Sequence, residues 1–310
     1  MSAMKANILL LMAAAIWGLA FVAQRVGMDY VGPFTFNGFR FALGAASLLP
    51  LIWYYRNKDQ QQTAKAGSVS AIKAGFLVGL ILFSGASLQQ IGLVYTTAGK
   101  AAFITCLYIV IVPILGIFLR HYISLTNWVS SGIAVVGLYL LCVKENFYIS
   151  YGDLLQLVGA LFWSVHILLI DYFAARVKNV LHLTFFQAAT CSALSLVTAS
   201  CLETITLSGL MAGIVPLLYG GIASVAIAYT LQAIGQKYAP PSHAAIIMSM
   251  ETVFAAVGGF LVLGERLSFQ ELMGCLLMFA GMMLTQVKGA QPANAAKNMD
   301  KAGDKASCER

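Results

Sequence analysis

The sequence predicts an all-α membrane protein of ten transmembrane helices, arranged as two inverted five-helix repeats. Three observations predict this fold: the composition, ten long apolar segments and an internal repeat. Hydrophobic residues make up 60% of the 310 residues, and charged residues only 10%. A soluble domain averages about 25% charged residues. This chain therefore cannot cover a globular surface with polar groups, which excludes a large soluble protein.

Ten apolar segments approach or reach the length of about 20 residues that a helix needs to cross a bilayer. The first resembles a signal peptide at its start, but its apolar run continues without an evident cleavage site, so we expect a span there. The ten predicted spans are 7–26, 34–55, 72–94, 101–119, 127–143, 153–173, 182–201, 210–231, 243–264 and 270–287.

The second half of the chain repeats the first. Residues 88–119 recur 143 residues later, from Leu231 onwards. The matches at this offset are Leu88, Gln89, Ile91, Gly92, Tyr95, Ala101, Ala102, Ile104, Val110 and Gly116 with Leu231, Gln232, Ile234, Gly235, Tyr238, Ala244, Ala245, Ile247, Val253 and Gly259. At an offset of 146 residues, Trp17 matches Trp163.

Span parity gives the repeat its geometry. Each half holds five spans, and an odd number places the two halves in opposite orientations, as in the inverted repeats of secondary transporters. The predicted units are a first repeat over residues 1–145 and a second over 146–288. Residues 289–310, rich in Ala, Lys, Asn and Asp, predict a disordered cytoplasmic tail.

The basic residues predict the orientation. The net charge is +7, but Lys and Arg do not form the stripe that nucleic-acid binding needs, so we expect no nucleic-acid partner. Most fall in segments on the side of the N-terminus; the other side has Arg25, Lys100, Lys144 and Arg266. The positive-inside rule then places both termini in the cytoplasm. We expect an integral protein of the plasma membrane, the inner membrane of a bacterium.

The cysteines and histidines give no sign of a metal centre. Six cysteines lie in apolar segments or the tail, and no Cys/His pair has the spacing of a zinc site. The motifs HExxH, GxSxG and CxxC are also absent. We expect no catalytic residues, no metal and no cofactor.

Two stretches resemble a known family. LGIFLRHYISLTNWVSSGIAVVGLYLL and LVLGERLSFQELMGCLLMFAGMML are similar to the paired repeats of the EamA family of the drug/metabolite transporter superfamily, over residues 7–287. The resemblance implies ten helices, a central cavity lined by the first four helices of each half, and a peripheral fifth helix. It also implies transport of amino acids, other small metabolites or drugs, often outward.

Glu251 is the first candidate for a functional residue. It follows His243 by eight residues, which places it about 12 Å into its helix and near the midplane of a hydrocarbon core about 30 Å thick. A carboxylate there normally faces a cavity or a partner, so it could bind a cation or carry a proton. A structural hydrogen bond is the alternative. Tyr108 occupies the equivalent position of the first half. Thr252 follows Glu251, at a position where the family often has proline.

Six other positions are candidates for substrate contact or gating. Arg40 lies about 9 Å inside its span and could meet an anionic group, snorkel to the interface or pair with an acid. Trp17 and Trp163, about 15 Å deep, could line the cavity or pack as core. His166 could shuttle protons or be a hydrogen-bonded core residue. The repeat mates Gln89 and Gln232 could bind substrate or join helices.

Proline and glycine predict hinges. Pro113 removes a backbone hydrogen bond inside the fourth span, and Gly258 and Gly259 occupy the neighbouring region of the mirror helix. Alternate bending of these helices would open the cavity to one side at a time; static packing by small residues is the alternative.

These features predict a secondary transporter, expected to export small organic metabolites such as amino acids, or drugs, by alternating access. Its partners would be the solute, the lipid bilayer and, if transport is coupled, protons. A membrane-embedded enzyme or a channel is the alternative. The sequence does not fix the solute or the oligomeric state.

Overall fold

The described chain is helical throughout. The computed structural model describes residues 1–60, 69–96, 98–119, 123–142, 150–263 and 268–288, and no strand occurs within these ranges. The all-α class is therefore confirmed. The predicted tail, residues 289–310, lies outside the described residues.

The helices follow one another with short connections. Their bounds are α1 (Ala3–Gly27), α2 (Pro33–Gln60), α3 (Ala71–Tyr95), α4 (Ala98–Thr105), α5 (Tyr108–Phe118), α6 (Leu125–Cys142), α7 (Tyr151–Ala174), α8 (Val180–Leu202), α9 (Leu207–Ala212), α10 (Ile214–Leu218), the π-helix η2 (Tyr219–Ala228), α11 (Tyr229–Gln236), α12 (Pro241–Met248), α13 (Glu251–Leu263) and α14 (Phe269–Lys288).

Within the described residues, seven helical stretches are long and apolar enough to cross a membrane: α1, most of α2, α3, α4 with α5, α7, α8, and α10 through α11. The other three predicted spans correspond to α6, to α12 with α13, and to α14; α6 and α14 contain shorter apolar helices. Length and composition thus support seven spans, and the ten-span arrangement stays a prediction.

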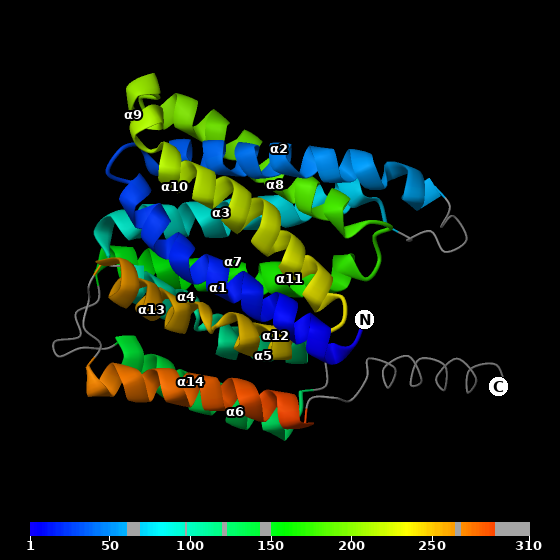
Figure 1. Cartoon of the computed structure of the whole chain (residues 1–310), viewed down its shortest axis with the longest axis vertical. Helices are drawn as coiled ribbons and strands as arrows, with labels where there is room; N and C mark the ends of the chain where they lie inside the picture. The colour runs from blue at the N-terminus through cyan, green and yellow to red at the C-terminus, as the bar shows by residue number, and fades with distance from the viewer. Residues whose placement is uncertain (61–68, 97, 120–122, 143–149, 264–267, 289–310) are drawn as a thin grey trace.

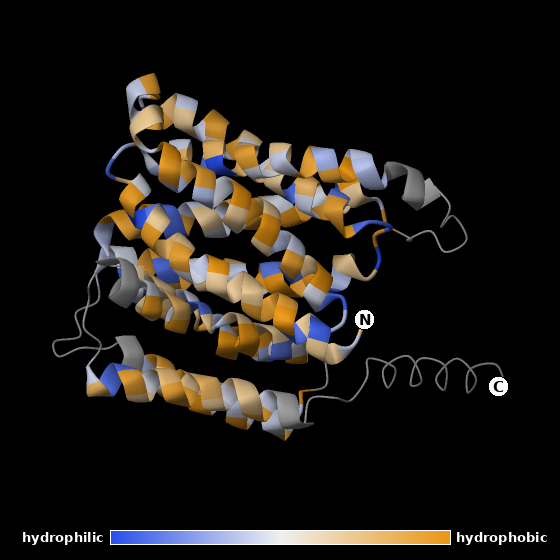
Figure 2. Cartoon of the chain, in the orientation of Figure 1, coloured by the Kyte–Doolittle hydropathy of each residue, from blue (hydrophilic) through white to orange (hydrophobic). Residues whose placement is uncertain are grey.

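Polar and apolar side chains are distributed as a membrane requires. Val197 is 64% exposed and Val215 is 72% exposed, whereas Gln156 and Gln187 are completely buried. Figure 2 shows hydrophobic stretches along the outermost helices. Apolar side chains therefore face the surroundings, and buried polar side chains such as that of Gln156 bond within the bundle.

The helices lie side by side with their long axes in a common direction (Figure 1). α2 packs on α8 at one edge, α6 packs on α14 at the other, and α3 packs on α7 and α8 between them. The helices α12 and α13 pack on α1, and their counterparts in the repeat, α4 and α5, pack on α7. Corresponding elements of the two halves therefore make corresponding contacts.

Small residues allow the closest of these contacts. A Cβ at Gly137 of α6 would lie 2.7 Å from the carbonyl oxygen of Gly274 in α14. A Cβ at Gly281 of α14 would lie 2.9 Å from the carbonyl oxygen of Ser130 in α6. Backbones can approach this closely only where side chains are missing.

Two helical segments are interrupted at equivalent residues. α4 ends at Thr105 and α5 begins at Tyr108; α12 ends at Met248 and α13 begins at Glu251, which is the same pattern 143 residues later. In both interruptions the backbone N–H of the second linking residue bonds three residues back, Leu107 to Ile104 and Met250 to Ile247. Such tight turns inside a helix often mark functional hinges.

Candidate functional site

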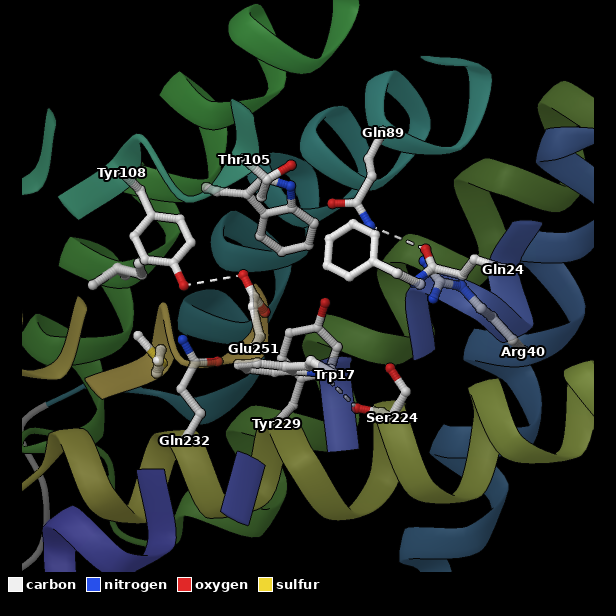
Figure 3. A pocket seen from close by; sticks show the side chains of 14 residues that line it. Trp17, Gln24, Arg40, Gln89, Thr105, Tyr108, Ser224, Tyr229, Gln232 and Glu251 are labelled. Carbon is white, nitrogen blue, oxygen red and sulfur yellow. Dashed lines mark hydrogen bonds between the residues drawn. The ribbon is translucent and has the colours of Figure 1, made fainter. Parts of the chain in front are cut away.

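A cavity lies among helices of both halves of the chain (Figure 3). Its volume of about 50 Å³ is enough for a few water molecules, since one water needs about 10–15 Å³ by this measure. Its lining residues are Trp17, Phe21, Gln24, Arg40, Gln89, Thr105, Tyr108, Trp163, Ile167, Ser224, Tyr229, Gln232, Met248 and Glu251.

All the predicted contact residues except His166 line this cavity. Both members of each pair that the repeat relates line it: Trp17 and Trp163, Gln89 and Gln232, and Tyr108 and Glu251. The structure thus brings together residues that the sequence places far apart. Their roles in binding stay predictions.

Glu251 is 5% exposed and holds the two interrupted segments together. The Tyr108 hydroxyl donates to its Oε1 at 3.0 Å (Figure 3), and the Cys106 thiol donates to the same oxygen at 3.3 Å. Cys106 also lies 3.8 Å from the carbonyl oxygen of Ser249, so the two interruptions touch. The structural hydrogen bond that we weighed as an alternative role is therefore present.

The interruption also explains why a carboxylate is tolerated at this depth. Glu251 is the first residue of α13, where the aligned peptide dipoles make the helix end positive. Ser249 and Thr252 direct their hydroxyls to carbonyl oxygens three residues back, at Ile246 and Ser249. Such side-chain bonds compete with helical ones and are the local signal for the interruption.

Arg40 is 3% exposed and lines the cavity from α2. Its Nε donates to Asn37 Oδ1 at 2.9 Å, and its guanidinium carbon lies 4.8 Å and 5.7 Å from the ring centres of Phe41 and Phe36. No acidic side chain of the described segments lies within ion-pair distance of it. Arg40 thus neither snorkels nor pairs with an acid, and cation–π contacts stabilise it.

The two tryptophans of the cavity wall differ in the hydrogen bonding of their indole N–H groups. The Trp17 indole N–H donates to the carbonyl oxygen of Ser224 at 3.2 Å, and its ring meets Tyr229 edge-on at 5.1 Å. The Trp163 indole N–H is buried without a hydrogen-bond partner. An unpartnered buried donor is costly, so Trp163 offers a bond to a bound molecule.

The glutamines also differ between the halves. Gln89 donates to Gln24 Oε1 at 3.0 Å, which ties α3 to α1. The Oε1 of Gln232 is buried without a partner. Gln89 thus fits the helix-joining alternative, whereas Gln232 has an acceptor available for a ligand.

His166 lies behind the cavity wall. Its Nε2 is 2.9 Å from Gln187 Oε1, and its ring contacts those of Trp163 and Tyr229 at 5.8 Å. This geometry matches the hydrogen-bonded core histidine that we weighed beside a proton shuttle.

The interruptions do not coincide with the predicted hinges. α5 continues through Pro113, and α13 continues through Gly258 and Gly259. The Ser131 hydroxyl donates to the carbonyl oxygen of Ile109 at 3.4 Å, which is the acceptor that Pro113 leaves without a helical donor. A Cβ at Gly258 would lie 2.5 Å from the Leu19 side chain, as the packing alternative expects. Bending at these residues stays a prediction.

Several lining residues were not predicted from the sequence. Phe21 and Gln24 follow Trp17 by four and seven residues, so helical spacing would have placed them on the same face. Tyr229 precedes Gln232 by three residues and could have been found in the same way. Ser224 lies in the π-helix η2, where the residue spacing departs from 3.6 per turn. Only the glycines of YGGIASVAIA hint at that irregularity.

No metal site is visible in the described part of the chain, where no three His, Cys, Asp or Glu side chains gather closely enough to hold an ion. The site is instead a mixed aromatic and polar cavity with one acid and one base. An all-helical bundle with apolar surfaces and such a cavity is an integral membrane protein of the solute-carrying class.

The chain belongs to the EamA-like transporter family, whose model matches residues 4–143 and again residues 150–287. It is 31% identical to an "Uncharacterized transporter" of Archaeoglobus fulgidus (strain ATCC 49558 / DSM 4304 / JCM 9628 / NBRC 100126 / VC-16) over 288 residues, which cover 91% of this chain and 86% of that protein. "Uncharacterized transporter YoaV" of Bacillus subtilis (strain 168) is 21% identical over 87% of this chain and 92% of its own length.

A solved crystal structure has the same fold. It superposes with a TM-score of 0.76 over 92% of this chain and 98% of its own, at 17% identity. The family and the relatives support a general transporter function for this chain.

Proposed function

We propose that the chain crosses the membrane ten times, as inverted repeats over residues 1–145 and 146–288, and carries a small organic solute by alternating access. The observation that carries the proposal is the cavity to which both halves contribute repeat-related residues. The equivalent interruptions of α4–α5 and α12–α13 also support it. Broken helices whose ends meet at the midplane are typical of secondary transporters.

The charges of the cavity favour a solute that carries charges of both signs. Arg40 lies at one end beside Gln24, Glu251 lies with Tyr108 towards the other, and Trp17 and Tyr229 lie between them (Figure 3). A carboxylate would neutralise the guanidinium of Arg40, and an ammonium group would replace the Tyr108 hydroxyl at Glu251. An amino acid has both groups at short range.

The direction of transport and its energy coupling are proposed from other features. Export is the direction that the family resemblance favours. Glu251 can exchange a proton for a cationic group, so proton coupling, solute exchange and facilitated diffusion are the modes to distinguish. The excess of Lys and Arg on the side of both termini supports cytoplasmic termini, and the plasma membrane is the proposed location.

Counterflow into proteoliposomes tests the proposal. Purified protein is reconstituted with a panel of amino acids, organic cations and organic anions inside, and uptake of the labelled solute is followed with and without a pH gradient. We expect accumulation of at least one zwitterion and weaker or no accumulation of singly charged solutes. Absence of counterflow for every solute would contradict the carrier proposal.

A further inference from the structure

Two polar contacts at opposite ends of the helices occupy equivalent positions in the two repeats. In one, Lys100 Nζ on α4 lies 2.9 Å from Asp153 Oδ2 on α7. In the other, His243 Nε2 on α12 lies 3.0 Å from Asn7 Oδ1 on α1. The offset between Lys100 and His243 is 143 residues and that between Asn7 and Asp153 is 146, the two offsets that relate the repeats.

The first member of each contact lies at the same distance from the cavity. Lys100 precedes the lining residue Thr105 by five residues on α4, and His243 precedes the lining residue Met248 by five residues on α12. At 1.5 Å per residue, each lies about 7.5 Å from the wall along its helix. These residues therefore flank the cavity.

The second members have the same relation. Asp153 precedes Trp163 by ten residues on α7, and Asn7 precedes Trp17 by ten residues on α1, about 15 Å in each case. Each contact thus joins two helices that line the cavity, one contact at each end.

We propose that the contacts Lys100–Asp153 and His243–Asn7 act as paired pins. Each pin holds one end of the cavity closed, and the two pins break in turn during transport. The inference rests on the inverted arrangement of the proposed function. Separation of α4 from α7 opens one end, and separation of α12 from α1 opens the other. Both pins are formed in this structure.

The two pins differ in chemistry. Lys100 and Asp153 form an ion pair whose acidic side chain is 4% exposed and whose lysine side chain is 30% exposed. Asp153 also accepts from Thr96 Oγ1 at 2.5 Å and from the backbone N–H of Ser150 at 2.8 Å. The opposite pin joins an imidazole to a neutral amide. Charge-assisted hydrogen bonds are roughly twice as strong as neutral ones, so the end at Lys100 is the more firmly closed.

Hydrogen–deuterium exchange of the full-length protein in lipid nanodiscs tests the pins. Because Asp153 also caps α7, the variants are made at Lys100 and His243. Lys100→Met should accelerate amide exchange in α4 about tenfold, and His243→Leu should accelerate it in α12 about threefold. Each should leave the other helix at its wild-type rate, because the pins act at opposite ends. Lys100→Arg, which keeps the ion pair, and Lys73→Met, at an exposed lysine of α3, should both match the wild type.

A transplanted ion pair gives a second test. Asn7→Asp combined with His243→Lys installs the Lys–Asp pin at the opposite end and should slow exchange in α12 severalfold. Three outcomes would overturn the proposed pins. Lys100→Met could accelerate exchange equally in α4 and α12, it could leave both rates unchanged, or the double variant could fail to slow exchange in α12. Hydrogen–deuterium exchange can be measured without a solute. If the exchange pattern is as expected but no solute shows counterflow, only the proposed function is refuted.

Discussion

Glu251 and Tyr108 share one position of the repeat but differ in charge. Both begin a helix at an interruption, and their side chains meet across the centre of the molecule at 3.0 Å. A buried carboxylate that accepts hydrogen bonds from a tyrosine hydroxyl and a thiol is stable while the cavity is empty. A cationic group can then replace the donor without leaving the charge unpaired.

Replacing the two residues separately tests this exchange of partners. Glu251→Gln removes the charge and should slow counterflow about tenfold or more, with loss of any pH dependence. Tyr108→Phe removes only the hydroxyl and should slow it about threefold, the cost of one hydrogen bond. Cys106→Ser, which keeps a donor at Glu251, is the matched control. Wild-type counterflow by Glu251→Gln at every pH would refute both a cation-binding and a proton-carrying role.

Arg40 is the residue proposed to bind the carboxylate of the solute, as Glu251 is proposed to bind its cationic group. Its guanidinium is buried between aromatic rings, without an acidic partner among the described residues. Arg40→Met should weaken binding of a zwitterion about tenfold to a hundredfold, as expected for a lost charged hydrogen bond. Binding of its amide, which lacks the carboxylate, should change little. Isothermal titration calorimetry with both ligands measures this difference, and equal losses for the two would contradict carboxylate recognition.

At the scale of the element, close packing holds α1 against α13. A Cβ at Gly18 would lie 2.6 Å from the carbonyl oxygen of Glu251 and 2.8 Å from the backbone nitrogen of Ala255. Backbone atoms cannot yield as a flexible side chain can, so α1 must shift if Gly18 gains a side chain. Gly18 therefore helps to place the carboxylate.

Gly18→Ala should destabilise the protein by about 1–3 kcal/mol, the usual cost of overpacking. The control is Gly132→Ala in α6, where an added Cβ meets nothing within 4 Å and helix propensity improves by up to about 1 kcal/mol. Thermal unfolding in detergent should show a lower Tm for the first variant and an unchanged or higher Tm for the second. Equal Tm values would contradict the close contact of α1 with α13.

The helices illustrate what a sequence can reveal. Hydropathy located α1, α3 and α7 because one continuous apolar run specifies each. The interruption at Cys106 and Leu107 was not predicted, because neither residue breaks a helix and the turn is stabilised by contact with the other repeat. The repeat did identify the residues that meet in the cavity. Their partners, such as Ser224 for Trp17, depend on tertiary packing that periodicity does not encode.

At the scale of the whole molecule, the proposed odd number of spans per repeat predicts the sides on which the loops lie. A cysteine at position 60 and one at position 295 should both resist a membrane-impermeant thiol reagent in intact cells and react after permeabilisation, because the positive-inside rule predicts a cytoplasmic location for both. The measurement compares labelling before and after permeabilisation. External labelling of both positions would contradict the orientation.

The central claim is that one cavity between the repeats is the transport route, open to each side in turn. Thr105 lines that cavity, so a Thr105→Cys variant reports on it. The background replaces Cys106 by serine and removes the other native cysteines, and the background without Thr105→Cys is the control. In proteoliposomes of one orientation, the cysteine should react with an impermeant reagent applied from either side, transported solute should protect it, and modification should stop counterflow. A cysteine that reacts from neither side, or counterflow that survives its modification, would contradict the claim.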